Sequence, residues 1–321
     1  MFDIIIPARF GSTRLPGKAL RTIAGKPMVA WVWERARQAG ARQVVIATDD
    51  ARIADEMTAR GAEVAMTRSD HASGTDRLAE VVDQLSLADD AVVVNLQGDE
   101  PLMPVVNIQR VATMLNEAVG ADMATLMEPV DVIEAAKESV VKVVASDSGR
   151  ALYFSRAVIP AHRDAAEPAR LFRHIGLYAY RAGFLKRFVG WPPAVAEQSE
   201  SLEQLRALAH DAHIQIELAP EPVPAGVDTE DDLAAVQDLL SGGSSAAARA
   251  RRLARSEPSA AARHRAASRD RNVAGTIAGR AGAACHRSTH QCAGGRQQCR
   301  SPRDLAWHDA SDEHHGEGGP L

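Results

Sequence analysis

The strongest constraint on the fold is a repeated pattern in which short apolar runs are separated by segments with helical spacing. The runs are four to six residues long, the length of buried strands, and cover Phe2–Ile6, Gln43–Ala47, Glu63–Met66 and Ala91–Leu96. Strands that alternate with helices are joined by crossover connections, which place the strands parallel in one sheet. The sequence therefore predicts an α/β fold with a mainly parallel sheet flanked by helices.

Three helices can be predicted from their ends. The first spans residues 27–39, because Pro27 stands in a first-turn position and Gly40 follows the last turn. Its expected buried stripe is Val29, Val32, Trp33 and Ala36. A second helix is expected over residues 75–87, and a third from Thr229, whose hydroxyl can cap the helix with an acid three residues later.

Beyond Gly120 the pattern becomes richer in strands. The expected strands are Met123–Leu126, Val140–Ala145, Ala151–Ser155, Ile175–Tyr180 and Ile214–Leu218. We interpret this part as a smaller α+β extension that carries a second substrate or a subunit contact.

The charge of the chain changes sign near Gly242. Residues 1–242 carry 24 basic and 35 acidic side chains, whereas residues 243–321 carry 13 arginines, no lysine and 7 acidic side chains. This Arg/Ala-rich tail has only six large apolar residues, too few to offset chain entropy, so we expect it to be disordered. Its composition also resembles a frameshift product of GC-rich coding sequence. The alternative is an arginine-rich arm that binds nucleic acid.

All three cysteines, Cys285, Cys292 and Cys299, lie in the tail. Their six-residue gaps do not fit the short Cys-x2–4-Cys spacing of zinc sites. Residues 1–242 thus need no disulfide and suit a reducing compartment. The chain shows neither a leader-like N-terminus nor a run near the ~18 apolar residues of a membrane span, so we expect a soluble cytoplasmic protein.

The loop that follows the first strand, PARFGSTRLPGK at residues 7–18, is rich in glycine and basic side chains. Ligands of open parallel sheets bind at loops that leave the carboxyl ends of strands. Backbone N–H groups at the glycines, together with Arg9, Arg14 and Lys18, could hold a polyphosphate. The loop matches neither a Walker A nor a dinucleotide-binding motif, and the alternative is a surface loop with solvated charges.

Two carboxylates are candidate functional groups to act together with that loop. Asp99 follows the strand at residues 91–96, so it lies on the same rim and could hold Mg²⁺, although an ordinary loop aspartate is the alternative. Glu100 is less clear, because adjacent side chains on extended backbone point apart. Asp228 precedes the last helix, where an acid by itself would simply stabilise the helix dipole.

Residues 1–242 resemble the sugar-activating nucleotidyltransferases, and among them the cytidylyltransferases that act on 3-deoxy-manno-octulosonate (Kdo). The matching stretches include IIPARFGSTRLPGK (5–18), VIATDD (45–50), MTRSDHASGTDRLAE (66–80), VVNLQGDEP (93–101), RHIGLYAYR (173–181) and GVDTEDDL (226–233). The resemblance covers about three quarters of the chain and excludes the tail.

This resemblance implies a Rossmann-like nucleotidyltransferase fold and the transfer of CMP from CTP to Kdo, with Mg²⁺ required, for lipopolysaccharide biosynthesis. It implies a cytidylyltransferase domain over residues 1–242, in which 1–120 mainly bind nucleotide and 121–225 mainly bind sugar and form a homodimer. No nucleic-acid or membrane partner is expected.

The resemblance also assigns roles to residues. It makes Lys18, Arg9, Asp99 and Asp228 catalytic, with Asp99 and Asp228 as the metal ligands. It places Arg9, Arg14, Lys18, Ser73, Arg77 and Gln97 at the nucleotide. It places Arg156, His174, Tyr178, Glu203 and Gln204 at the sugar.

Other readings of these residues remain open. His174 opens a predicted strand and Tyr178 lies four residues on, so both face one side, but such a pair is often part of a core. Glu203 and Gln204 could be ordinary helix surface. The segment 163–171 is shorter than the family pattern and 195–201 is more polar, which affects the sugar loops and the dimer contact.

Three alternative functions are also compatible with the sequence. The first is a cytidylyltransferase for another acidic sugar, such as sialic acid or an 8-amino analogue of Kdo. The second is a non-catalytic nucleotide-binding module, which would be expected to lack a metal carboxylate or the loop lysine. The third is nucleic-acid binding through the tail, which would be salt-dependent.

Overall fold

The computed structural model describes residues 1–12, 15–161 and 170–241. The expectations for Arg14, for most of the 163–171 segment and for the 243–321 tail with its cysteines lie outside the described residues.

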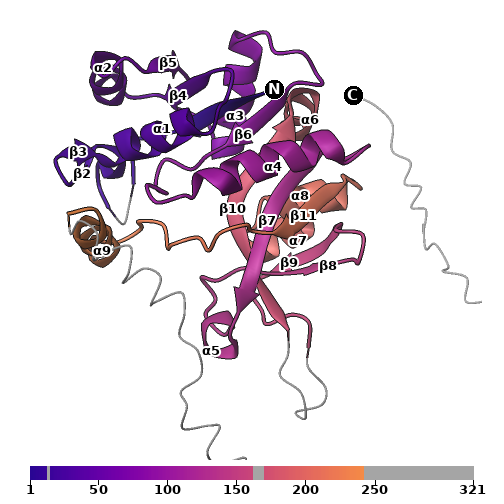
Figure 1. Cartoon of the computed structure of the whole chain (residues 1–321). Coiled ribbons are helices and arrows are strands. Elements are labelled where there is room, and N and C mark those ends of the chain that lie inside the picture. The colour runs from indigo at the N-terminus through magenta and orange to yellow at the C-terminus, as the bar shows by residue number, and fades with distance from the viewer. Residues whose placement is uncertain (13–14, 162–169, 242–321) are drawn as a thin grey trace, which may run out of the picture. The chain divides into compact units, whose positions relative to one another are not determined.

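A mixed sheet of nine strands runs through the described part of the chain (Figure 1). The strand order is β11-β7-β10-β6-β1-β4-β5, and β8 pairs with both β10 and β9. The strands are β1 Phe2–Pro7, β4 Val44–Thr48, β5 Glu63–Met66, β6 Val92–Asn95, β7 Met123–Val130, β8 Lys142–Ala145, β9 Ala151–Ser155, β10 Leu171–Arg181 and β11 Ile214–Leu218. A hairpin of β2 Thr22–Ile23 and β3 Lys26–Pro27 stands apart from this sheet.

The sheet is parallel in the part formed by β1, β4, β5 and β6 and mixed beyond it. β1 pairs in parallel with β4 and β6, and β4 pairs in parallel with β5. β10 runs antiparallel to β6, β7 and β8, whereas β11 is parallel to β7. The predicted α/β class and mainly parallel sheet are therefore confirmed.

Helices cover both faces of the sheet (Figure 1). They are η1 Lys18–Leu20 (a 3-10 turn), α1 Met28–Gln38, α2 Ala51–Ala59, α3 Gly74–Gln84, α4 Val105–Glu117, α5 Val132–Ala135, α6 Ala182–Phe188, α7 Val195–Glu200, α8 Gln204–Ala209 and α9 Glu230–Ser241. In β1, Ile4 and Ile6 pack with apolar residues of α1, α2 and α4, whereas Ile5 packs with those of α3, α6 and α8. Successive strand side chains alternate between faces, so this continuous apolar run marks a strand buried on both sides.

A smaller apolar cluster brings the end of the described chain back to its beginning. Leu233 and Val236 of α9 pack with Leu15, Ile23 and Met28. This packing anchors the segment that precedes α9 beside the loop that follows β1.

Several predicted boundaries are confirmed and some need correction. The buried stripe of α1 is as predicted, and Thr229 and Asp232 form the expected reciprocal hydrogen bonds at the start of α9. His174 does not open its strand, because β10 begins at Leu171 and pairs from there with β7. The polar segment at residues 195–201 folds largely as α7. In the described ranges no helix is long and apolar enough to cross a membrane.

Candidate active site

A cavity of about 330 Å³ lies at the carboxyl ends of β1 and β6. It is lined by Pro7, Ala8, Arg9, Ser12, Lys18, Ala19, Met28, His71, Ala72, Ser73, Gly74, Arg77, Gln97, Gly98, Asp99 and Asp228. The described part of the loop after β1 thus meets the loop after β6, as the parallel sheet predicts.

The two loops approach so closely because residue 98 is glycine. A Cβ atom at Gly98 would lie 2.7 Å from the carbonyl oxygen of Pro7, closer than real Cβ contacts allow. Gly98 therefore lets the backbone carrying Gln97 and Asp99 pack directly on the backbone that leads to Arg9.

Lys18 joins the two predicted metal carboxylates. Its Nζ donates to Asp99 Oδ2 at 2.7 Å and to Asp228 Oδ1 at 2.8 Å. Gly17, in a left-handed conformation with φ of +65°, turns the chain into η1 and so sets the direction of Lys18. Burial lowers the pKa of Lys18, but the attraction of Asp99 and hydrogen bonds to both carboxylates outweigh it, so the pKa is raised.

The same two carboxylates suit a divalent cation. Asp99 and Asp228 direct oxygens at one cationic atom, which is what an oxygen-liganded ion requires of its protein ligands. Within the ranges described, no group of three or more His, Cys, Asp or Glu side chains could hold a metal. An ion at this place would therefore need further oxygens from substrate phosphates and water, which is common for Mg²⁺.

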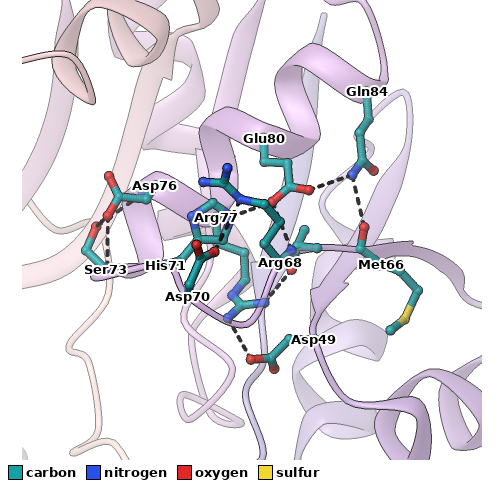
Figure 2. Close-up of polar contacts among 11 residues, drawn as sticks. Asp49, Met66, Arg68, Asp70, His71, Ser73, Asp76, Arg77, Glu80 and Gln84 are labelled. Carbon is teal, nitrogen blue, oxygen red and sulfur yellow. Dashed lines mark hydrogen bonds and ion pairs between the residues drawn. The ribbon is translucent and has the colours of Figure 1, made fainter.

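Figure 2 shows how the start of α3 is fixed beside the cavity. The Ser73 hydroxyl accepts from the Asp76 N–H at 3.1 Å, and the Asp76 carboxylate accepts from the Ser73 N–H at 3.0 Å. The Arg77 guanidinium donates to the Thr67 hydroxyl and lies 3.2 Å from the Asp49 carboxylate. Ser73 and Arg77 both line the cavity as predicted, but Arg77 is also held by the protein.

The sequence assigned no role to two residues near this cavity, although Glu100 was the less clear of the carboxylate candidates. His71 lines the cavity, and its Nε2 contacts the Glu80 carboxylate (Figure 2). Burial raises the pKa of Glu80, but the hydrogen bonds from His71 and from the Arg68 N–H outweigh this and lower it. His71 lies within the family-like stretch at residues 66–80, but a histidine in a turn does not by itself indicate a binding site.

Glu100 is the second. Burial, with the nearby charge of Asp99, raises the pKa of its carboxyl to about 8. Its Oε2 is buried and has no hydrogen-bond partner among the described residues. A Cβ atom placed on Gly176 or Gly226 would lie 3.8 or 3.6 Å from its side chain, so Glu100 lies beside two glycines from later in the chain, which local sequence could not show.

The predicted sugar residues do not line this cavity; four of them lie in or beside a buried cluster on the α3 and α8 side of the sheet. The rings of His174 and Tyr178 have centroids 5.2 Å apart, so they share a side of β10 as predicted. A bulge between Ile175 and Tyr178 leaves two residues out of register, which preserves the alternation. Burial, with a smaller effect of Arg173, lowers the pKa of His174 to about 3 and keeps its imidazole neutral.

Glu203 and Gln204 are not the helix surface that the alternative interpretation proposed. Gln204 is buried, and Glu203 Oε2 accepts a hydrogen bond from the Thr75 hydroxyl at 2.7 Å. Burial raises the pKa of Glu203, and the hydrogen bonds from Thr75 and Ser73 partly offset this rise.

Arg156, the fifth predicted sugar residue, is held by three backbone carbonyl groups. Its guanidinium donates to the carbonyl oxygens of Glu200 at 2.7 Å, Glu138 at 3.0 Å and Ser201 at 3.2 Å. These contacts tie the end of β9 to α7, and the role of Arg156 in binding the sugar stays a prediction.

Comparison with known proteins shows the family to which this chain belongs. The family model described as cytidylyltransferase matches residues 4–214. The 3-deoxy-manno-octulosonate cytidylyltransferase of Pseudomonas fluorescens is 54% identical over 248 residues, which cover 74% of this chain and 98% of that protein. The protein of the same name from Vibrio vulnificus strain CMCP6 is 53% identical over 246 residues, which cover 74% of this chain and 98% of that protein.

A solved structure matches as well. The structure of CMP:2-keto-3-deoxy-manno-octonic acid synthetase complexed with CTP has a TM-score of 0.72 and 42% sequence identity. The match covers 75% of this chain and 99% of that chain.

Proposed function

The chain belongs to the cytidylyltransferase family, and from this we infer that it transfers CMP from CTP to Kdo and releases pyrophosphate. The observation that carries this inference is the 54% identity over 98% of a relative that bears this activity in its name. The cavity agrees with it, because basic and carboxylate side chains from four segments of the sequence meet where a nucleotide phosphate chain could lie.

The reaction is a phosphoryl-group displacement. The anomeric hydroxyl oxygen of Kdo forms a bond to the α-phosphorus of CTP, the bond from that phosphorus to the bridging oxygen breaks, and the hydroxyl proton is lost. Such a transfer requires positioning and charge stabilisation more than covalent work from the protein.

We propose that Lys18 supplies the central positive charge. Its ammonium is protonated throughout the physiological range, because its pKa is raised from an already high value. Once phosphates enter the cavity, Lys18 can exchange a carboxylate contact for a phosphate oxygen. Arg9 and Gln97 line the same cavity and are proposed as further phosphate or nucleotide contacts, together with Ser73 and Arg77.

We propose that Asp99 and Asp228 hold Mg²⁺. The ion would neutralise phosphate charge and lower the pKa of the attacking sugar hydroxyl. Lys18 places one positive charge between the two carboxylates, which reduces the repulsion between them.

We propose that the second half binds the sugar through His174, Tyr178, Glu203 and Gln204. A neutral imidazole, a phenol, a carboxylate and an amide provide donors and acceptors that suit a polyhydroxylated molecule. Arg156 is the proposed contact for the sugar carboxylate, by exchange of one of its carbonyl contacts.

We also propose a cytoplasmic homodimer that serves lipopolysaccharide biosynthesis. Large apolar side chains are exposed on the strands farthest from β5, namely Leu152, Tyr153 and Leu218. A second copy could cover them. Light scattering after gel filtration should then give twice the mass of the chain.

The activity is tested by pyrophosphate release from the full chain with CTP and Mg²⁺. Parallel reactions contain Kdo, 8-amino Kdo, sialic acid or no sugar. Release with Kdo at least about 100-fold above every other sugar would support the proposal. Preference for another sugar would redirect the substrate assignment, and nucleotide binding without any release would favour a non-catalytic module.

A further inference from the structure

A hydrogen bond from Thr75 connects the turn beside the nucleotide cavity to the predicted sugar cluster. The Thr75 hydroxyl, in the first turn of α3, donates to Glu203 Oε2 at 2.7 Å across 128 residues of sequence. Thr75 is buried, so water does not readily replace this contact.

The other oxygen of the Glu203 carboxylate has a different environment. Oε1 is buried and has no hydrogen-bond partner among the described residues. A buried acceptor without a donor costs free energy, and such groups in native proteins call for a ligand, water or a functional reason. Glu203 therefore presents one oxygen held by Thr75 and one oxygen that lacks a donor, and the Ser73 hydroxyl also lies within reach of the carboxylate.

A second buried acceptor occurs in the same cluster. Asn95 Oδ1, at the end of β6, is also buried without a partner among the residues described. Asn95 is the register partner of Tyr178, and the Tyr180 hydroxyl lies within hydrogen-bonding reach of both Asn95 and Thr75. Hydroxyl groups are the donors that such acceptors would bind, and a sugar carries several.

The turn that holds Thr75 also lines the nucleotide cavity. His71, Ala72, Ser73, Gly74 and Arg77 line the cavity, whereas Thr75 is absent from its lining and contacts Glu203 instead. The reciprocal hydrogen bonds between Ser73 and Asp76 fix this turn (Figure 2). Adjacent residues of one rigid turn therefore serve two different regions.

We propose that Thr75 is a positioning residue for the sugar: its hydroxyl holds Glu203 so that Oε1 accepts a hydrogen bond from a hydroxyl group of the acidic sugar. The inference rests on the proposed transfer of CMP to Kdo. It adds a residue to that function and links the sugar cluster to the nucleotide turn.

The test compares Thr75→Val, which keeps the shape but removes the hydroxyl, with Thr75→Ser, which keeps the hydroxyl. Losing one hydrogen bond to a charged group should raise KM for Kdo roughly tenfold to a hundredfold in Thr75→Val. KM for CTP should stay within about twofold, since the interaction removed concerns the sugar alone. Thr75→Ser should restore most of the affinity for Kdo.

Two further variants separate positioning from general damage. If Thr75 acts through Glu203, adding Thr75→Val to Glu203→Gln should change KM for Kdo much less than it does in the wild type. Thr113→Val is the matched control, because the Thr113 hydroxyl is exposed and donates to the Gln109 carbonyl of its own helix. It should leave both KM values and the melting temperature unchanged.

The outcomes are distinct. Unchanged KM for Kdo in Thr75→Val, equal increases for Kdo and CTP, or failure of Thr75→Ser to restore binding would each overturn the role of Thr75. In all three cases a wild-type chain that turns over Kdo would leave the proposed function intact. A folded wild-type chain that is inactive with Kdo would instead overturn the proposed function, and this inference with it.

Discussion

Replacing Lys18 by alanine should separate catalytic loss from loss of stability. Lys18 Nζ lies 2.7 and 2.8 Å from the two carboxylates, and its side chain is only 13% exposed. The side chains of Asp99 and Asp228 are 39% and 49% exposed, so water can solvate them when the ammonium is gone.

The expected magnitudes follow from that difference in exposure. Partly exposed ion pairs contribute up to about 1 kcal/mol each, so the free energy of unfolding should fall by about 1–2 kcal/mol. For a domain of this size the melting temperature should then fall by about 2–8 °C. The loss of a preorganised charge at the reacting phosphate is larger, about 10²–10³-fold in kcat.

The assay is pyrophosphate release at saturating CTP and Kdo, together with a thermal melt of the same sample. Lys26→Ala is the matched control, because Lys26 makes an ion pair with Glu34 at 2.7 Å but does not line the cavity. Its kcat should stay within about twofold of the wild type. If folded Lys18→Ala kept kcat within tenfold of the wild type, or if Lys26→Ala lost as much, the assigned role of Lys18 would be wrong.

The pH dependence gives an independent check on Lys18. Its pKa is raised in the folded state, so its contribution to stability is present below the unfolded value of 10.5 and is lost only as pH rises through the higher folded value. Between about pH 6 and pH 9, kcat should therefore show no ionisation of Lys18.

Three other changes test different parts of the structure. Asp99→Asn should lower kcat by about 10²-fold or more and raise the Mg²⁺ concentration needed for activity; an unchanged Mg²⁺ titration would remove Asp99 from the proposed metal site. The pKa of His174 is lowered from 6.5 to about 3, so the unfolded chain binds the proton first and the contribution of His174 to stability should fall by about 2 kcal/mol from pH 7 to pH 5. In urea unfolding the wild type should therefore lose about 2 kcal/mol relative to His174→Gln over this range, because other groups such as Glu100 act equally in both proteins, and an equal pH dependence of the two would contradict the buried neutral imidazole. In Gly98→Ala the new Cβ would meet the Pro7 carbonyl at 2.7 Å, so kcat should fall at least about tenfold in a protein whose circular dichroism is unchanged.

The sequence predicted the parallel part of the fold well, because a strand that is buried on both faces appears in the sequence as a continuous apolar run. A central strand such as β1 is apolar on both faces through its middle, as the run Ile4–Ile6 is. The bounds of the helices with a weaker apolar stripe were not predicted. α2, for example, buries only Ile53 and Met57 in nine residues, which is too little periodicity to stand out.

The site was predicted as a set of residues but not as an arrangement. Family motifs named Lys18, Asp99 and Asp228, yet nothing local shows that one ammonium joins carboxylates that are 81 and 210 residues away. The contact between Thr75 and Glu203 is likewise a product of tertiary packing, and a threonine in a helix start gives no sign of it.

The position of β10 has a consequence for building chimaeras with relatives that use other acidic sugars. Its Tyr178–Arg181 segment pairs with β6, a strand of the first 120 residues. On its other edge, residues between Leu171 and Tyr180 pair with β7. An exchange of residues 121–225 would therefore replace a strand in the middle of the host's own sheet, and the donor would have to reproduce its register against β6. Sugar preference in this enzyme should be easier to transplant side chain by side chain than as a cassette.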